Sequence, residues 1–349
     1  MATIQDVAAK AGVAPITVSR VLNNSGYVSQ ATRQRVEAAA QALNYVPNSL
    51  ASSLRSNRTN ILALLLADIS NPFWTTVARG VEDVANQHGY SVILCNTDEK
   101  ERKQEEYVAL LLRKRVDGFL LVPTTAATES IRMIQQQQVP IVLVDRAIPD
   151  LAVDTVRGDT YGSAYTLANH LIALGHRRIA VLAGPCYIST SAERVEAVCV
   201  ALRNAALPID AKLILYGEYA VESGYAMASQ VLAEQPTAIV AGNNFIAIGV
   251  GRFLQEAELR VPQDISVVCF DDVPISWGSE PFLTVAVQPA YEIGQRATEL
   301  LLTRVSGKEL GPPQEHQLPV EILIRRSTAR LDASHSFGIT AKDRLNRPA

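Results

Sequence analysis

The spacing of hydrophobic residues changes near residue 60. Before that point apolar side chains recur every three or four positions, as in Ile4, Val7 and Ala11, which is the period of an amphipathic helix. After it, short unbroken apolar runs such as 61–67 and 118–122 alternate with helical patterns, which is typical of buried parallel strands. The pattern therefore predicts a small helical module followed by a large α/β region.

Three helices are predicted within residues 1–46. Thr3 and Asp6 have the spacing of a capping box at the start of the first helix, and Gly12 ends that helix. Pro15 is well placed as the first residue of a second helix, after a turn of three residues. A third helix is predicted from about Gln30 to Leu43. Two short helices joined by such a turn form a helix-turn-helix, although plain helical packing produces a similar pattern.

The second helix carries polar chemistry on the side opposite its apolar face. At about 100° per residue, its valines and leucine share one face. The other face then presents a guanidinium, a hydroxyl, an amide and an alkyl group, from Arg20, Ser19, Asn23 and Ile16. This mixture suits the edges of base pairs in a major groove.

Residues 47–59 predict a hinge. Asn48 can cap a helix over the following SLASSLRS stretch, which is too short to be stable alone in water. Leu54, beside Arg55, suits insertion into a minor groove, where an apolar wedge kinks the duplex. The alternative is a frayed linker in which Leu54 packs against the larger region.

The distribution of charge indicates where a polyanion would bind. The whole chain has a net charge of -3, but residues 1–58 hold six Lys and Arg against Asp6 and Glu37, which gives +4 and leaves -7 for the rest. The four cysteines lie far apart and form no C-x-x-C pair, so reduced thiols in a cytoplasmic protein are expected. No signal peptide is recognised, and the apolar run 61–67 is far short of the roughly 20 residues of a membrane span.

The region 60–330 predicts two similar lobes. Its strand-like and helix-like stretches alternate, and the strand–helix–strand unit at 61–96 resembles that at 179–217 in order and length. Parallel sheets bind ligands at the carboxyl ends of their strands. Carboxylates, amides, an arginine and aromatic rings gather at these ends, and they suit the hydroxyls and C–H face of a polyhydroxylated ligand. Each of these residues alone is more often a helix cap or a core aromatic. The strand-end residues include Asp68, Asn71, Phe73, Trp74, Thr124, Asp145, Arg146, Arg194, Tyr219, Asn243, Asp271 and Trp277.

The stretches TIQDVAAKAGV, TVSRVLN, YVPN and LASSLRS resemble the headpiece of the LacI/GalR family of bacterial transcription regulators, without gaps over residues 3–58. The resemblance implies that Ile16 and Arg20 read base edges and that Pro15 lies close to them. It also implies that Leu54 is a minor-groove wedge with Ala51 and Arg55 at its side. Phosphate contacts are implied mostly for Thr17, Ser19, Asn23, Arg33 and Tyr45, and Thr3, Tyr27 and Asn48 complete the expected DNA-binding set.

The stretches NPFW, LGHRRIAVLAG, VPQDISVVCFDD and PAYEIGQRATELLL resemble the regulatory domain of the same family, which is similar to periplasmic sugar-binding proteins. The resemblance implies three crossovers between the lobes, near residues 158, 288 and 319. The N-lobe would then hold about 60–158 and 289–318, the C-lobe about 159–288 and 319–330, and residues 331–349 would be a loose tail. The implied effector cleft is lined by Phe73, Trp74, Asp145, Arg194, Tyr219, Asn243, Asp271 and Trp277, to which the strand-end argument adds Thr124.

These patterns predict a homodimeric transcriptional repressor that binds a pseudo-palindromic operator and responds to a small molecule in the cleft. A sugar or sugar acid is favoured as the effector over a purine-like ligand. No catalytic residue, metal or cofactor is expected. One alternative is a dinucleotide-binding enzyme, since Gly249-Val250-Gly251 follows a strand, but Leu254 takes the place of the third glycine. The other is a free-standing solute-binding protein, against which the DNA-binding module argues.

Overall fold

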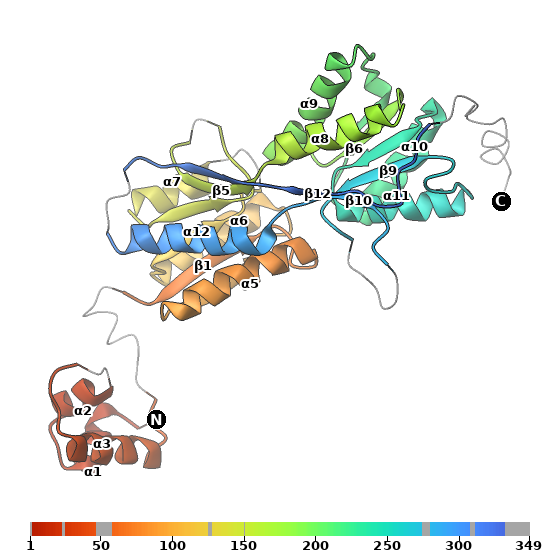
Figure 1. Cartoon of the computed structure of the whole chain (residues 1–349). Helices are drawn as coiled ribbons and strands as arrows, with labels where there is room; N and C mark the ends of the chain where they lie inside the picture. Colours follow the sequence, from red (N-terminus) through yellow and green to blue (C-terminus); the bar gives the residue numbers. More distant parts are fainter. Residues whose placement is uncertain are drawn as a thin grey trace. The chain divides into compact units, whose positions relative to one another are not determined.

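The computed structural model describes residues 2–22, 25–46, 58–124, 128–149, 151–273, 280–307 and 311–331. The chain divides into two compact units, residues 1–59 and residues 60–349 (Figure 1). Each unit has hydrophobic clusters of its own. The first unit is called the headpiece below.

The headpiece is a three-helix module. Its helices are α1 (Ile4–Ala11), α2 (Pro15–Leu22) and α3 (Gln30–Ala42). The predicted capping box is confirmed, because Thr3 Oγ1 accepts from the Asp6 amide while the Asp6 carboxylate accepts from the Thr3 amide. Gly12 closes α1 with a φ of 64°, a left-handed conformation that glycine adopts at little cost.

Two mixed α/β lobes form the second unit. The N-lobe is built on a sheet of order β11-β5-β4-β3-β1-β2, and the C-lobe on a sheet of order β12-β10-β9-β8-β6-β7. All pairings are parallel except that of β12 with β10. The N-lobe strands are β1 (Ile61–Leu66), β2 (Ser91–Asn96), β3 (Gly118–Leu121), β4 (Ile141–Val144), β5 (Asp154–Gly158) and β11 (Glu315–Leu318). The C-lobe strands are β6 (Ile179–Ala183), β7 (Ile214–Tyr216), β8 (Ala238–Ala241), β9 (Ser266–Phe270), β10 (Thr284–Val287) and β12 (Glu321–Leu323).

Helices cover both faces of each sheet (Figure 1). In the N-lobe, α5 (Pro72–Gln87) and α12 (Ala290–Val305) pack on one face, and α6 (Glu101–Arg113) and α7 (Glu129–Gln136) pack on the other. In the C-lobe, α10 (Val221–Val231) pairs with α11 (Asn244–Glu256), and α8 (Thr160–Ala173) pairs with α9 (Ser189–Asn204). Burial on both faces explains why the central strands are continuous apolar runs.

The chain passes between the two sheets after β5, after β10 and between β11 and β12. The sequence did not predict these three elements β5, β10 and β11 as strands. Two of them have polar sequences, DTVRG in β5 and EHQL in β11, so no apolar run indicates a strand there. The predicted boundaries of the lobes, hinge and tail stay predictions.

The Gly249-Val250-Gly251 motif does not open a helix, as the dinucleotide alternative requires. It lies inside α11, where a Cβ on Gly249 would come within 2.1 Å of the Val221 carbonyl oxygen. Gly249 therefore allows α10 and α11 to approach closely. Among the described residues, no helix combines the length and the apolar character needed to cross a bilayer.

Candidate functional site

The exposed face of α2 carries most of the predicted base-reading groups. Ile16 is 54% exposed, an unusual position for a large apolar side chain, and Pro15 and Arg20 are exposed beside it. Thr17 is half-buried. The sequence placed Ser19 on this outward face, which is wrong, because its side chain is only 9% exposed. Ser19 is one of the three buried residues of α2, together with Val18 and Val21.

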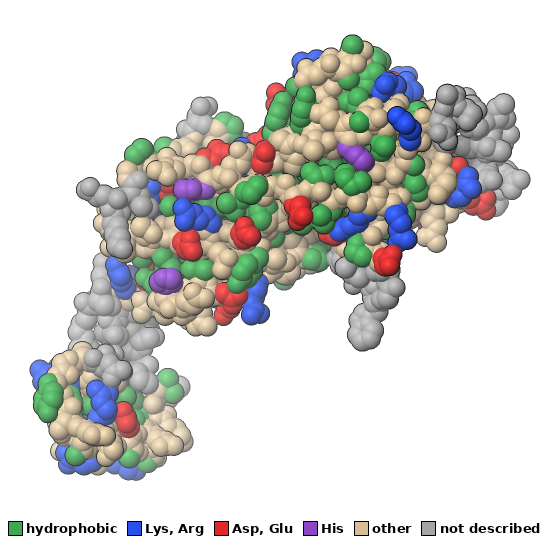
Figure 2. Space-filling model, viewed as in Figure 1, with side chains coloured by type: hydrophobic (Ala, Val, Ile, Leu, Met, Phe, Trp, Pro, Cys, Tyr) green, Lys and Arg blue, Asp and Glu red, His purple; other side chains and the backbone are tan. Residues whose placement is uncertain are grey.

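Other predicted DNA contacts have structural partners in the headpiece. Thr3 caps α1, and an Arg33 guanidinium nitrogen donates to the Val21 carbonyl at 3.3 Å. Tyr45 packs against the headpiece core, whereas Tyr27 is 93% exposed. Figure 2 shows more basic than acidic side chains on the visible face of this unit. The remaining predicted contacts lie outside the described residues, and their roles stay predictions: Asn23, Asn48, Ala51, Leu54 and Arg55.

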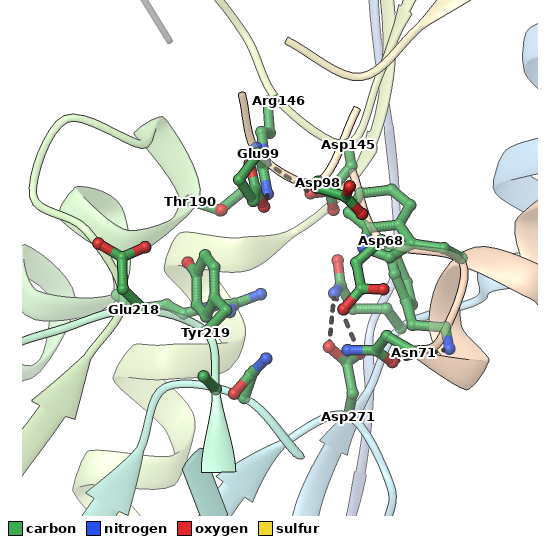
Figure 3. Close-up of a pocket in the computed structure, with 16 residues that line it drawn as sticks. Asp68, Asn71, Asp98, Glu99, Asp145, Arg146, Thr190, Glu218, Tyr219 and Asp271 are labelled. Carbon is green, nitrogen blue, oxygen red and sulfur yellow. Dashed lines mark hydrogen bonds and ion pairs between the residues drawn. The ribbon is translucent and has the colours of Figure 1, made fainter. Parts of the chain in front are cut away.

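A cavity of about 250 Å³ lies between the two lobes, where the carboxyl ends of their strands meet (Figure 3). We call it the cleft cavity. Seven of the nine predicted effector residues line it, namely Phe73, Trp74, Asp145, Arg194, Tyr219, Asn243 and Asp271. Further lining residues are Asp68, Asn71, Asp98, Glu99, Arg146, Thr190, Glu218, Ala220 and Gln288. In Figure 3, Glu218 and Tyr219 face Asp68 and Asn71 across the cavity.

Thr124 does not line this cavity, so its prediction was wrong. It is fully buried, and its amide and hydroxyl both donate to Gln104 Oε1, at 3.0 and 3.2 Å. Thr124 therefore satisfies a buried glutamine inside the N-lobe. Trp277 lies outside the described residues, and its contribution stays a prediction.

Cavity residues make three contacts that involve aromatic rings, one between two rings and two between a guanidinium group and a ring. Phe73 and Trp74, in the first turn of α5, meet edge to face with ring centroids 4.7 Å apart. The Arg146 guanidinium lies 5.7 Å from the centre of the Trp74 ring, and that of Arg194 lies 4.1 Å from the Phe270 ring. Such contacts fix the flat groups in one orientation.

The two arginines are held in different ways. Arg146 makes a bidentate ion pair with Glu99, at 2.5 and 2.7 Å, and also donates to the Pro123 carbonyl. Arg194 donates to the Gly242 carbonyl at 2.5 Å. Its side chain is therefore anchored by a neutral partner, which leaves its charge to act on the cavity.

Two buried carboxylates line the cavity, Asp145 from the N-lobe and Asp271 from the C-lobe. Asp145 and Asp271 each follow a strand, and each adopts a left-handed backbone, with φ of 68° and 60°. Burial raises the pKa of Asp145 to about 6, although Arg146 and Arg194 oppose the shift. Burial also raises the pKa of Asp271, against Arg194 and a hydrogen bond from Gln288 at 3.1 Å. Strained, buried carboxylates of this kind gather at functional sites.

Five buried polar atoms at the cavity have no hydrogen-bond partner among the described residues. They are Asp145 Oδ1, Arg146 Nε, Arg194 Nε, Tyr219 Oη and Gln288 Oε1. Arg146 Nε lies 3.8 Å from Asp145 Oδ2, too far for a hydrogen bond. Buried polar groups are nearly always paired in folded proteins, so a cluster of five points to a ligand with several hydroxyl groups.

Side-chain contacts join the two lobes around the cavity. Asn71, at the start of α5, and Asn244, at the start of α11, exchange two buried hydrogen bonds of 2.9 and 3.0 Å. Arg157 on β5 forms an ion pair with Glu193 on α9, in which one guanidinium nitrogen, Nη1, donates to both carboxylate oxygens at 2.6 and 2.7 Å. Since Asn71 and Arg194 line the cavity beside these pairs, a ligand there would act directly on the contacts between the lobes.

The cavity residues that the sequence missed follow a simple rule. Asp98 and Glu99 come after β2, and Glu218 comes after β7, so the strand-end argument would have found them. Gln288 follows β10, a strand that was not predicted. Within the described part of the chain, no group of three His, Cys, Asp or Glu side chains is placed to hold a metal ion.

The chain is similar to known regulators over nearly its whole length. Residues 3–48 match the model for bacterial regulatory proteins of the lacI family, and residues 59–331 match that for periplasmic binding proteins and the sugar binding domain of the LacI family. The ribose operon repressor of Escherichia coli (strain K12) is 36% identical over 332 residues, which cover 94% of this chain and all of that protein.

Solved structures agree. The Lac repressor dimer bound to operator and the anti-inducer ONPF has a TM-score of 0.83 at 28% identity, covering 94% of this chain and 99% of that chain. A LacI family transcriptional regulator from Enterococcus faecium with bound ribose has a TM-score of 0.71 at 32% identity, covering 78% of this chain and all of that chain. The chain is a member of the LacI family of bacterial transcription regulators.

Proposed function

We propose that this protein is a transcriptional repressor whose affinity for its operator is set by a neutral monosaccharide bound in the cleft cavity. The observation that carries the proposal is the cluster of five unpaired, buried polar atoms beside the Phe73 and Trp74 rings. Hydroxyl groups both donate and accept, so one sugar ring can pair with these donors and acceptors together while its C–H face packs on an aromatic ring.

The charge of the cavity favours a neutral sugar over a sugar acid. Six acidic side chains line it against two arginines, and one of these arginines is already paired with Glu99. An anionic ligand would face repulsion from the remaining carboxylates, which act strongly across a buried site. The sequence alone favoured either a sugar or a sugar acid as the effector. The arrangement of charges in the cavity favours the neutral sugar.

The size of the cavity favours one sugar ring. Its volume of about 250 Å³ corresponds to about eight liquid waters at about 30 Å³ each. Ribose is the ligand we propose, since a ribose operon repressor is 36% identical and a ribose-bound regulator is 32% identical to this chain.

A homodimer would bind the operator through two headpieces. Edge strand β2 exposes the apolar side chains of Ile93 and Leu94, which are 36% and 43% exposed and would be covered by a second copy. The hinge roles of Ala51, Leu54 and Arg55 are part of this proposal and rest on the family resemblance. Because its target is the chromosome, the protein would act in the cytoplasm.

Binding measurements test the proposal. Calorimetric titration with ribose, galactose and gluconate should give saturable binding of ribose and none of gluconate. Arg194→Ala should abolish ribose binding while leaving operator binding by the unliganded protein intact, and Arg203→Ala, an exposed change on the same helix, should leave both intact. Full ribose binding by the Arg194→Ala variant would refute the site.

A further inference from the structure

The two ends of the N-lobe sheet carry side chains of opposite charge. All strands of this sheet are parallel, so their carboxyl ends meet at the cleft cavity and their starts meet at the opposite end, which we call the hinge end. The N-lobe lines the cleft cavity with four acidic residues, namely Asp68, Asp98, Glu99 and Asp145. At the hinge end, α6 finishes in a run of exposed basic residues, Arg113, Lys114 and Arg115. We call these three residues the basic patch.

The chain enters the N-lobe beside the basic patch. Asn60 precedes β1 and lies between the starts of two neighbouring strands. Its carbonyl oxygen accepts from the Ser91 amide at 2.9 Å, and its amide donates to Asp117 Oδ2 at 2.9 Å. Lys114 is three residues before Asp117, so the Cα atoms of the two residues are at most about 11 Å apart. The basic patch therefore lies close to the point at which the hinge joins the N-lobe.

The basic side chains at the two ends of α6 differ in their partners. Arg102 and Lys103, in the first turn, each form an ion pair with a carboxylate of the N-lobe. Arg113 and Lys114 form no ion pair within the part of the chain that the structure describes. Their charges are therefore available to an anionic partner outside the N-lobe.

Stabilisation of the helix is the alternative explanation for these charges. Arg113 is in the last turn of α6 and Lys114 is its C-cap, where a cation interacts favourably with the partial negative charge of the helix end. This effect would act on the stability of the protein. It predicts no change in the affinity for another molecule, so the two explanations can be separated by experiment.

We propose that the basic patch is a second DNA-binding surface, which contacts phosphates of the duplex that the headpiece binds. Leu54, the proposed wedge, lies six residues before Asn60, and that length of chain spans at most about 22 Å. A duplex bound by the headpiece and hinge would therefore pass close to the hinge end of the N-lobe. The acidic cleft end would repel the same duplex.

Phosphate contacts of this kind carry no sequence information, so the basic patch would raise the affinity for every duplex by the same factor. In a homodimer each protomer would supply one basic patch. This inference rests on the proposed function, since it takes DNA binding by a dimer of headpieces as given.

The salt dependence of DNA binding tests the proposal on the full-length protein, by fluorescence anisotropy. The probe is a duplex of random sequence and about 40 base pairs, because phosphate contacts do not require an operator. Lys114→Gln removes one proposed contact from each protomer, so the slope of log K against log salt should become less steep by about 1.8. Between about 50 and 200 mM salt, the wild type should then lose about twelvefold more affinity than the variant.

Lys100→Gln is the matched control. Lys100 is an exposed lysine at the other end of α6, its side chain makes no cap hydrogen bond, and the substitution changes the net charge by the same amount. This variant should keep the slope of the wild type. Arg113→Gln should lower the slope as Lys114→Gln does, and it tests the basic patch should Lys114→Gln fold poorly.

Slopes that stay unchanged in both patch variants would overturn the proposal. With a loss of stability in chemical denaturation, that result would assign the two cations to the helix end alone. An equal change of slope in Lys100→Gln would also overturn it, because net charge and not the position of the patch would then be responsible. Failure of the wild type to bind any duplex would instead overturn the proposed repressor.

Discussion

The hydroxyl of Tyr219 should stabilise the complex with a sugar without stabilising the free protein. Tyr219 Oη is buried and has no hydrogen-bond partner among the described residues. A buried polar group left unpaired costs about 1–3 kcal/mol. Tyr219→Phe removes that group and keeps the ring. The free energy of unfolding of the ligand-free protein should therefore stay the same or rise by up to about 1 kcal/mol.

Sugar binding should change in the opposite direction. A hydrogen bond between neutral groups contributes about 0.5–1.5 kcal/mol, so Tyr219→Phe should weaken ribose binding by about two- to twelvefold. Chemical denaturation of the ligand-free protein and calorimetric titration with ribose measure the two quantities on one preparation. The distinguishing result is weaker ribose binding without a loss of stability, because damage to the fold would lower both the free energy of unfolding and the affinity for ribose.

Tyr225→Phe is the matched control in the same lobe. Tyr225 Oη donates to Glu256 at 2.5 Å on the surface, away from the cleft cavity. Its loss should cost about 0–1 kcal/mol of stability and leave ribose affinity unchanged. Destabilisation of the free protein by Tyr219→Phe, or unchanged ribose affinity, would refute the assignment of its hydroxyl to the ligand.

Three further predictions concern pH, packing and DNA. Burial raises the pKa of Asp145 to about 6, so the folded chain binds this proton more tightly than the unfolded chain. As the pH rises from about 4 to about 6, the free energy of unfolding should therefore fall, and at higher pH it should level off. Asp145→Asn should flatten that slope in denaturation curves, and an unchanged slope would assign it elsewhere. A Cβ at Gly184 would lie 2.2 Å from Tyr219 Cζ, so Gly184→Ala should reduce ribose affinity about tenfold. Gly251→Ala is the control, because its Cβ would have nothing within 4 Å, and it should leave ribose affinity unchanged. Equal effects of the two substitutions on ribose affinity would contradict the packing argument. Arg20→Ala should cost about 1–3 kcal/mol on operator and little on random DNA in mobility-shift assays, with Arg35→Ala as an exposed control, and equal losses on both DNAs would remove Arg20 from base reading.

Local rules predicted the headpiece and most of the sheet strands. Thr3, Asp6 and Gly12 carry capping chemistry that depends on a few neighbouring residues, and the structure confirms it. The buried central strands appear as apolar runs for an equally local reason. β5 and β11 were missed because their neighbours in the sheet, and not their own polar sequences, make them strands.

The cavity was predictable only as far as strand ends mark it. That rule located Asp145, Arg194 and Asp271, but it also selected Thr124, whose burial against Gln104 depends on a helix twenty residues earlier in the chain. Ser19 shows the same limit in the headpiece. The pairing of Asn71 with Asn244 joins residues 173 positions apart, and no periodicity reports such a contact.

The most direct test of the account is the linkage between the two ligands. Operator affinity should be measured with and without saturating ribose, and ribose affinity with and without saturating operator, on the same dimer. If the cleft cavity controls DNA binding, each ligand must change the affinity of the other by the same factor, and allosteric couplings of this kind are typically about 5- to 150-fold. Operator and ribose affinities that do not depend on each other would contradict the account.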